Sequence, residues 1–285
     1  MFLIRTYVNA FTYGLIIISV ILLLLSLLYR RDWRLLVLHI NVAAMIHPFE
    51  ILILIILNAY QYLPGILPDP RLDNYLGSYV SNSLIVPASA VIINAFSLSL
   101  GYTLGIAALF TGIDWYFTVI GIYKHLWWKS IYTGVGLSIL YAMSKRMWAG
   151  LQELRPTLLF RLLVIYLTYT SIYNVIILLL NKGGQLFRFQ AQWGEPEKVH
   201  QGLFYIYLLI TGIIVTLSIG LKLRLRYRLL GIVVLVLLNW TIGYYHIFAP
   251  QAADISAHQL IFVTIIAVFI NILFFFMAKL NYLFP

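Results

Sequence analysis

The sequence predicts an all-α protein, a polytopic bundle of transmembrane helices, and two observations carry that prediction. Of its 285 residues, 62% are hydrophobic and only 10% are charged, whereas a soluble domain carries about 25% charged residues. The apolar residues also fall in runs of the roughly 17–25 residues that a helix needs to cross a bilayer. So little charge cannot cover a water-exposed surface of this size. A soluble enzyme, a disordered chain and a nucleic-acid-binding protein are therefore excluded.

The apolar runs predict nine spans within a single membrane-embedded domain that covers residues 1–285. The first run continues into Arg30 and Arg31 without a small-residue cleavage site, so we interpret it as a span and not as a signal peptide. Residues 80–123 are apolar and long enough for two spans, which we expect to be joined by a turn at residues 99–103, around Gly101. The predicted spans are 9–29, 35–63, 79–98, 103–123, 129–148, 156–181, 202–221, 228–248 and 258–281.

The basic residues predict the orientation of these spans. Lys and Arg are enriched in the cytoplasmic loops of membrane proteins. The densest clusters here are residues 30–34, with three arginines, and residues 222–228, with one lysine and three arginines. We therefore place both clusters in the cytoplasm, which puts the N-terminus outside and the C-terminus inside. The net charge of +10 then reflects contact with anionic lipid and not with nucleic acid.

Three similar helix entries constrain the number of spans. An aromatic-Arg-Leu-Leu sequence begins at Trp33, at Phe160 and at Tyr227, and each looks like an anchor at the inner membrane interface. Because the first two must lie on the same side, an odd number of spans is needed between residues 64 and 155. Three spans give the nine-span arrangement, which we prefer. One span gives a seven-span alternative in which residues 112–128 lie in the interface.

The second predicted span carries the main candidate site. An ionisable residue inside a membrane helix is costly and is by default a candidate for function, and this span holds His39, His47 and Glu50. On a continuous α-helix these residues and Asn58 share a sector of about 100°. Pro48 lies among them and frees a backbone carbonyl. We interpret the sector as a site that handles a proton, an ion or a small solute; structural pairing of Glu50 with a histidine is the alternative.

Glu50 and His47 give the sharpest hypothesis. Glu50 lies near the middle of the predicted span, and His47, three residues away, is the nearest group able to hydrogen-bond it or exchange a proton with it. Such a pair can alternate between neutral and charged forms as a proton or cation passes. It predicts an activity that depends on pH with a midpoint between about 5 and 8. Asp114 is the second candidate, because the nine-span arrangement places it in the middle of the 103–123 helix.

The sequence gives no sign of a metal site or of a cofactor. It contains no cysteine, so thiolate metal sites and thiol nucleophiles are excluded. It also lacks the phosphate-binding loop, the His-Glu-x-x-His pair and the Gly-x-Ser-x-Gly elbow. His39 and His246 fall near opposite membrane edges, which argues against a pair of haem ligands. We therefore expect neither a metal ion nor a cofactor.

One stretch of acidic and aromatic residues resembles a known group of proteins. Asp114-Trp115-Tyr116-Phe117 is followed by Ile122-Tyr123-Lys124-His125-Leu126-Trp127-Trp128-Lys129 and by Tyr132-Thr133. This order is similar to the acidic-aromatic and Tyr-Lys-x-x-Trp pattern of small, uncharacterised multi-span membrane proteins of spore-forming Firmicutes. The upstream spacing of Leu72-Asp73-Asn74-Tyr75 and Pro87 is similar as well. The resemblance covers residues 64–148, with Asp114 where a Glu is usual, and it implies a Gram-positive plasma membrane but no activity.

Three classes of function remain for a protein of the cell membrane. The polar sector of the second span favours a transporter or a permeation-type protein. A non-catalytic assembly or scaffold subunit of a membrane complex is the first alternative, because it needs no polar core. A membrane-embedded enzyme acting on lipid is the second and the least favoured, supported only by the Trp, Tyr and Lys residues at 123–132. The expected partners are the lipid bilayer and either other membrane proteins or further copies of the chain.

Overall fold

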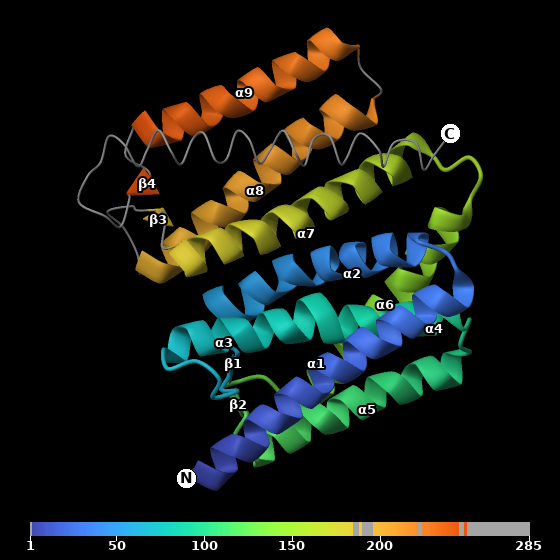
Figure 1. The fold of residues 1–285 in the computed structure, drawn as a ribbon, viewed down its shortest axis with the longest axis vertical. Helices are drawn as coiled ribbons and strands as arrows, with labels where there is room; N and C mark the ends of the chain where they lie inside the picture. Colours follow the sequence, from blue (N-terminus) through green and yellow to red (C-terminus); the bar gives the residue numbers. More distant parts are fainter. Residues whose placement is uncertain (1, 185–187, 190–195, 222–223, 245–247, 250–285) are drawn as a thin grey trace. The chain divides into compact units, whose positions relative to one another are not determined.

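The computed structural model describes residues 2–184, 188–189, 196–221, 224–244 and 248–249. Within them the chain is mostly helical, and its short strands form two antiparallel pairs (Figure 1). It divides into two compact units, unit 1 (Met1–Glu153) and unit 2 (Leu154–Pro285). Five described segments are long and apolar enough to cross a membrane: Thr12–Arg30, Arg34–Ile56, Pro70–Ala95, Leu158–Ile176 and Gln201–Gly220. This confirms the prediction of a helical protein with several membrane-spanning helices.

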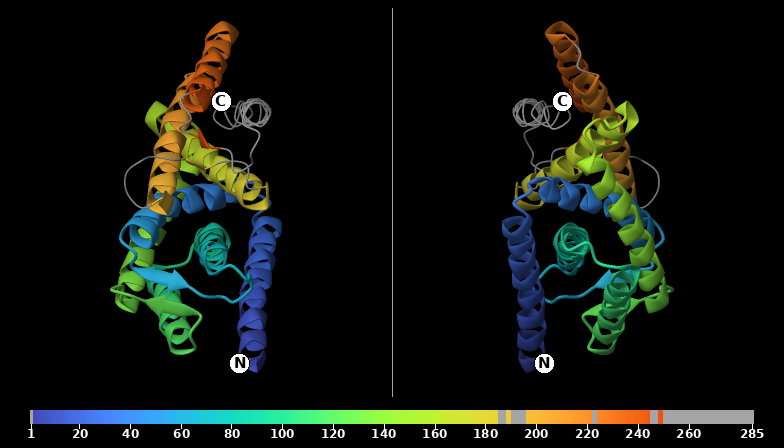
Figure 2. Two further views of the ribbon diagram at one scale, coloured as in Figure 1. Left: turned by 90° about the vertical axis from the view of Figure 1, so that its left-hand side faces the viewer. Right: turned by 90° about the vertical axis from the view of Figure 1, so that its right-hand side faces the viewer.

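Unit 1 is built around one buried helix, Pro70–Ala95, which we call the central helix. It consists of α3 (Pro70–Tyr79), a π-helical turn η2 (Val80–Ile85) and α4 (Val86–Ala95). The elements around it are α1 (Phe2–Arg30), α2 (Arg34–Glu50) with a π-helical turn η1 (Ile51–Ile56), α5 (Leu100–Val119) and α6 (Ser130–Gln152). α1, α2 and α6 contact the central helix, and α5 packs on α6. Figure 2 shows the central helix nearly end-on among its neighbours.

The composition of these helices explains their places. α4 has apolar and small residues on all sides, and nine of its ten residues are buried, as expected for a helix without a polar face. Large apolar side chains, such as those of Leu25, Leu28 and Leu109, are exposed on the outer helices. Polar side chains, among them His39 and Asn94, are buried instead. Polar groups inside and apolar groups outside are the arrangement expected of a bundle that contacts lipid.

Two prolines accompany the two π-helical turns of unit 1. Pro48 lies inside α2, just before η1 begins, and Pro87 lies in the first turn of α4, just after η2 ends. A proline inside a helix removes one α-helical hydrogen bond because it has no N–H. π-helical turns are rare in proteins, and those that do occur are often found at functional sites. Both turns lie beside the polar residues at the interface between α2 and the central helix.

One end of unit 1 is held by basic side chains. Arg30, Arg34 and Lys145 each donate to a backbone carbonyl at or just beyond the end of another helix. The acceptors are the carbonyls of Ala95, Leu151 (3.2 Å) and Leu98 (2.7 Å), respectively. The last carbonyls of a helix lack intrahelical donors and attract cations. The basic residues at this end therefore stabilise the helix ends as well as marking a membrane side.

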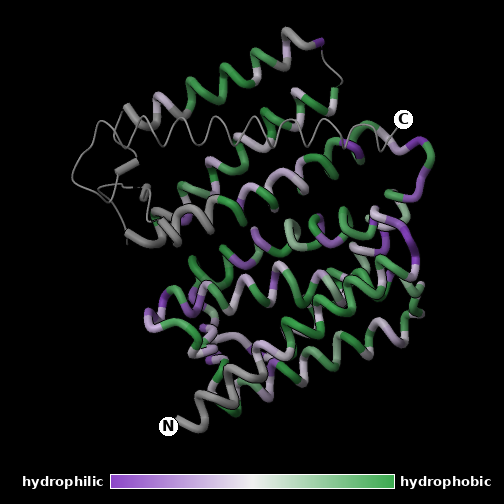
Figure 3. Tube along the Cα trace, viewed as in Figure 1, coloured by the Kyte–Doolittle hydropathy of each residue, from purple (hydrophilic) through white to green (hydrophobic). Residues whose placement is uncertain are grey.

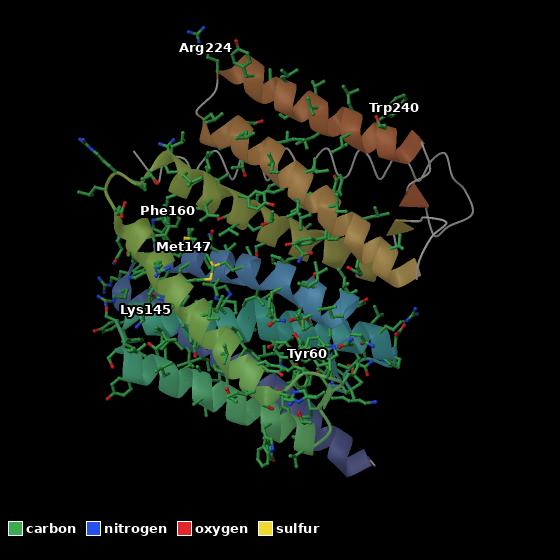
Figure 4. All side chains as sticks on the ribbon, turned by 180° about the vertical axis from the view of Figure 1, so that it is seen from behind. Tyr60, Lys145, Met147, Phe160, Arg224 and Trp240 are labelled. Carbon is green, nitrogen blue, oxygen red and sulfur yellow. The ribbon has the colours of Figure 1, made fainter. Side chains whose placement is uncertain are left out.

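The opposite end of unit 1 carries a short pair of strands. β1 (Tyr60–Tyr62) pairs antiparallel with β2 (Tyr123–His125), with Tyr62 opposite Tyr123. Figure 4 shows Tyr60 and Lys145 at opposite ends of the unit. The hydropathy colouring in Figure 3 shows hydrophilic residues in the connections at both ends and also along α2 within the bundle.

Unit 2 contains α7 (Leu158–Gly184), α8 (Pro196–Gly220) and α9 (Leu225–Tyr244), with β3 (Arg188–Phe189) paired to β4 (Phe248–Ala249). α8 packs against both α7 and α9. A Cβ atom on Gly212 would lie 2.8 Å from the ring of Tyr166, so the α7–α8 crossing depends on a residue without a side chain. Arg161 donates to the carbonyl of Gly220 at 3.1 Å, as the basic residues of unit 1 do at their helix ends.

Two helix bounds in unit 1 differ from the predicted spans. The helix predicted for 35–63 ends at Ile56, because the following residues leave it to form β1. The span predicted to begin at 79 begins at Pro70, because Asp69 caps the helix by accepting the N–H groups of Arg71 and Leu72.

The turn between the third and fourth helices also differs. It was predicted around Gly101, but Gly101 lies inside α5. The chain turns at residues 96–99 instead, where Ser97 has φ of +51°. The predicted span 258–281 lies outside the described residues.

Candidate functional site

His39 and His47 of α2 both contact Ser83 of the central helix. Nε2 of His39 lies 3.0 Å from the Ser83 carbonyl, and Nε2 of His47 lies 3.0 Å from Ser83 Oγ. A carbonyl oxygen only accepts hydrogen bonds, so His39 donates. Pro87, four residues after Ser83, has no N–H to offer that carbonyl in α-helical register. Both histidines are buried, and they join α2 to the π-helical turn η2.

Glu50 ends α2 and is buried against the central helix. Its Oε2 accepts a hydrogen bond from Tyr60 Oη at 2.6 Å, and its Oε1 accepts one from Ser78 Oγ at 2.8 Å. Asn82 donates in turn to Ser78 Oγ at 3.4 Å. The sequence pointed to His47 as the nearest partner of Glu50, whereas these hydrogen bonds come from neutral donors on β1 and the central helix.

Asn58 does not join the polar sector that the sequence predicted. The sector assumed one continuous α-helix through residue 58, but the helix changes to π geometry at Ile51 and ends at Ile56. Asn58 has φ of +47° in the segment that follows, and its side chain is exposed. Asn tolerates a left-handed backbone conformation better than most residues do, so Asn58 allows the chain to turn from the helix into β1.

Asp114 is buried within the last two turns of α5, and not at mid-helix as predicted. Its Oδ1 lies 2.9 Å from Nε2 of His125 in β2, and its Oδ2 accepts a hydrogen bond from Thr133 Oγ1 at 2.7 Å. The indole N–H of Trp128 donates to the same threonine oxygen at 2.9 Å. The motif that carries the family resemblance thus folds around Asp114.

Residues 57–63 and 122–128 form a compact structure that we call the cap. The carbonyl of Ala59 accepts backbone N–H groups from three successive residues of the second segment, Leu126 (2.9 Å), Trp127 (3.2 Å) and Trp128 (3.2 Å). Tyr62 donates its N–H to Asn74 Oδ1 at 2.8 Å, which ties the cap to the central helix. Backbone N–H groups therefore join the two segments of the cap to each other and join the cap to the central helix.

The cap contributes an aromatic cluster that sequence reasoning missed. Ring centroids lie 5.0 Å apart for Tyr60 and Tyr123, 4.8 Å for Tyr62 and Tyr123, and 5.4 Å for Tyr60 and Trp128. The alternating Tyr-Gln-Tyr of residues 60–62 was the available signal, because alternation is typical of a strand. It was overlooked because the surrounding residues are apolar enough to continue a helix.

Glu50 and Asp114 both line one cavity of about 360 Å³ in unit 1. Its walls come from α1, α2, the central helix, α5, α6 and the cap. The lining residues change from Trp128 of the cap, with Tyr132 and Thr133 at the start of α6, to Leu137, Leu140 and Met143 farther along α6. The cavity is therefore polar and aromatic beside the cap and apolar toward the basic end.

The cavity brings two buried carboxyl groups together with aromatic rings. The two carboxylates come from different helices, and none of the described residues that line the cavity is a lysine or an arginine. Among the residues that the structure describes, no three His, Asp or Glu side chains come together in a way that would hold a metal ion. The cavity offers a pole with carboxyl groups and aromatic rings and an apolar pole within a helical bundle.

Comparison of the chain with protein-family models, with curated proteins and with solved structures found no match.

Proposed function

We propose that the protein is a membrane transporter that carries a small solute through the cavity of unit 1, with Glu50 as its proton-handling residue. The observation that supports this is the pair of buried carboxylates, Glu50 on α2 and Asp114 on α5, which line one cavity. A carboxylate is costly to bury in a membrane bundle. A scaffold subunit does not need two of them facing an open space, whereas a binding site for a proton and a solute does.

The neighbours of Glu50 support a role in proton exchange. Tyr60 and Ser78 donate to it from two different elements, so a change in its charge alters bonds to both β1 and the central helix. Tyr60 belongs to the cap, which lines the polar end of the cavity. Protonation of Glu50 would thus be coupled to the contact between the cap and α2, as alternating access requires.

We further propose nine spans in a bacterial plasma membrane, with the N-terminus outside. This arrangement takes each of the three helical segments between residues 64 and 155 as a span, namely the central helix, α5 and α6. Of these, the central helix Pro70–Ala95 is among the five segments that are long and apolar enough to cross a membrane. The cluster of Arg30, Arg31 and Arg34 at one end of unit 1 supports a cytoplasmic location for that end. Because the chain contains no cysteine, Leu126→Cys in the cap gives a single label. Labelling from outside is expected, and labelling only from the cytoplasm would refute nine spans.

Proton movement in proteoliposomes tests the transport proposal. Vesicles loaded with a pH-sensitive dye are exposed to gradients of inorganic cations, organic cations, anions and neutral solutes in turn. We expect one class to drive proton movement in the wild type, with a pH midpoint between about 5 and 8. Glu50→Gln, which keeps the side-chain shape, should abolish it, whereas the matched acid-to-amide change Asp69→Asn outside the cavity should not. Full activity of Glu50→Gln would make this site structural and would favour the scaffold alternative.

A further inference from the structure

We propose that the cavity of unit 1 binds an amphiphilic organic monocation, an ammonium group on an apolar body, with the charged group beside the cap. This inference rests on the proposed transport function and names the class of its substrate. The first argument is charge. Glu50 and Asp114 face the cavity, and no lysine or arginine is found among the described residues that line it. The carboxylates would repel an anion, while a cation would be attracted.

The hydrogen bonds of the two carboxylates leave room for a cation. A carboxylate has about four acceptor sites. Glu50 accepts hydrogen bonds from the hydroxyl groups of Tyr60 and Ser78. Asp114 accepts one from the hydroxyl group of Thr133, and its other oxygen lies 2.9 Å from Nε2 of His125. These donors hold the carboxylates in place without filling their acceptor capacity. The site is therefore oriented in advance for a positive group.

The aromatic rings of the cap provide the second argument. Tyr60, Tyr123 and Trp128 line the cavity together with the carboxylates, and the ring centroid of Tyr60 lies 5.0 Å from that of Tyr123 and 5.4 Å from that of Trp128. Aromatic faces attract ammonium groups through their quadrupole, and quaternary ammonium ions are recognised in this way by cages of aromatic residues. Rings and carboxylates at one pole thus favour an alkylated ammonium group.

The size and the far end of the cavity provide the third argument. A volume of about 360 Å³ is within the range of sites for organic ligands, and a bare inorganic cation would need oxygen ligands on all sides. Away from the cap the lining is aliphatic, with Ile85, Leu140 and Met143. That pole matches an apolar body of the ligand. A hydrated inorganic ion would match only half of the cavity.

Equilibrium binding to the purified full chain in detergent tests the inference. The probe is radiolabelled benzyltrimethylammonium, compared with benzyl alcohol and benzenesulfonate, which share the ring but are neutral and anionic. We expect saturable binding of the cation only. Glu50→Gln and Asp114→Asn should each weaken it about thirtyfold, since each removes one partner of a buried charge pair. Trp128→Leu should weaken it severalfold, and Asp69→Asn should leave it unchanged.

A steric variant keeps the test valid if the carboxyl variants fail to fold. A Cβ atom on Gly136 would meet no atom within 4 Å, and Gly136 lines the cavity, so Gly136→Leu should fold and block binding. Equal binding of the cation and benzyl alcohol, or cation binding that none of these cavity variants weakens, would overturn the inference. Cation binding without proton-coupled flux would support the ligand class and refute transport. If only another solute drives proton movement and the cation does not bind, the proposed substrate class is refuted and the transport proposal is retained.

Discussion

Gly77→Ala offers a sharp test of how the cap is held on the central helix. A Cβ atom on Gly77 would lie 2.6 Å from Cβ and 3.0 Å from Cγ of Tyr62. The Cβ of Tyr62 cannot rotate away, so β1 itself must shift. The shift costs about 1–3 kcal/mol in overpacking and weakens the Tyr62–Asn74 hydrogen bond, at about 1 kcal/mol. Alanine regains about 1 kcal/mol of helix propensity, so we expect a net destabilisation of about 1–3 kcal/mol.

Unfolding in mixed detergent micelles, followed by tryptophan fluorescence, measures this effect. Gly105→Ala is the matched control, because a Cβ atom there would meet nothing within 4 Å; it should be neutral or stabilising by up to about 1 kcal/mol. Combining Gly77→Ala with Tyr62→Gly removes the colliding atom, so the double variant should lose less stability than the sum of the two single variants. If both glycine variants have the same stability, the close approach of β1 and the central helix is refuted.

Two further predictions concern carboxylates outside the cavity. Burial alone would raise the pKa of Asp32, but the hydrogen bonds and charge of Arg34 outweigh it and hold the pKa below its ordinary value. The stability from this pair is therefore present above about pH 4 and lost as the pH falls further. Because the pair is partly exposed, the loss should stay below about 1 kcal/mol, and Asp32→Asn should remove it from a pH series of unfolding curves. Asp73 accepts three backbone N–H groups of the preceding loop, at 2.7–2.9 Å. Asp73→Asn replaces one acceptor with a donor and should destabilise the protein by about 2–3 kcal/mol in the same assay. Asp69→Asn is the control and should not destabilise it, because Asn caps a helix as well as Asp does. Equal effects of the two variants would contradict this role of Asp73.

The apolar runs were sufficient to predict the helical membrane class and the approximate positions of most described helices, because lipid requires continuous apolar segments. The ends of those segments depend instead on helix capping and on the pairing of β1 with β2. The helix after Glu50 was overextended because residues 57–63 are apolar enough to continue it, although their backbone turns to pair with residues 122–125. That pairing joins segments about sixty residues apart, which no local pattern reveals.

The candidate site was predicted in part. Glu50 and Asp114 were chosen because ionisable groups are rare in membrane helices, and the structure brings both to one cavity. Their partners Tyr60, Ser78 and Thr133 are ordinary residues whose role depends on tertiary packing. Asn58 was included by extending helical geometry past the true end of the helix, where the rotation per residue no longer applies.

Chemical blocking of the cavity tests the central claim, that solute passes through unit 1, most directly. Because the chain contains no cysteine, Gly136→Cys places a single thiol in the cavity, and Leu154→Cys places one at a side chain that is 88% exposed. Both variants are treated with a cationic methanethiosulfonate in proteoliposomes, and solute-driven proton movement is measured. We expect modification to abolish proton movement in Gly136→Cys and to leave it unchanged in Leu154→Cys. Unchanged movement after complete modification of Gly136→Cys would contradict the claim.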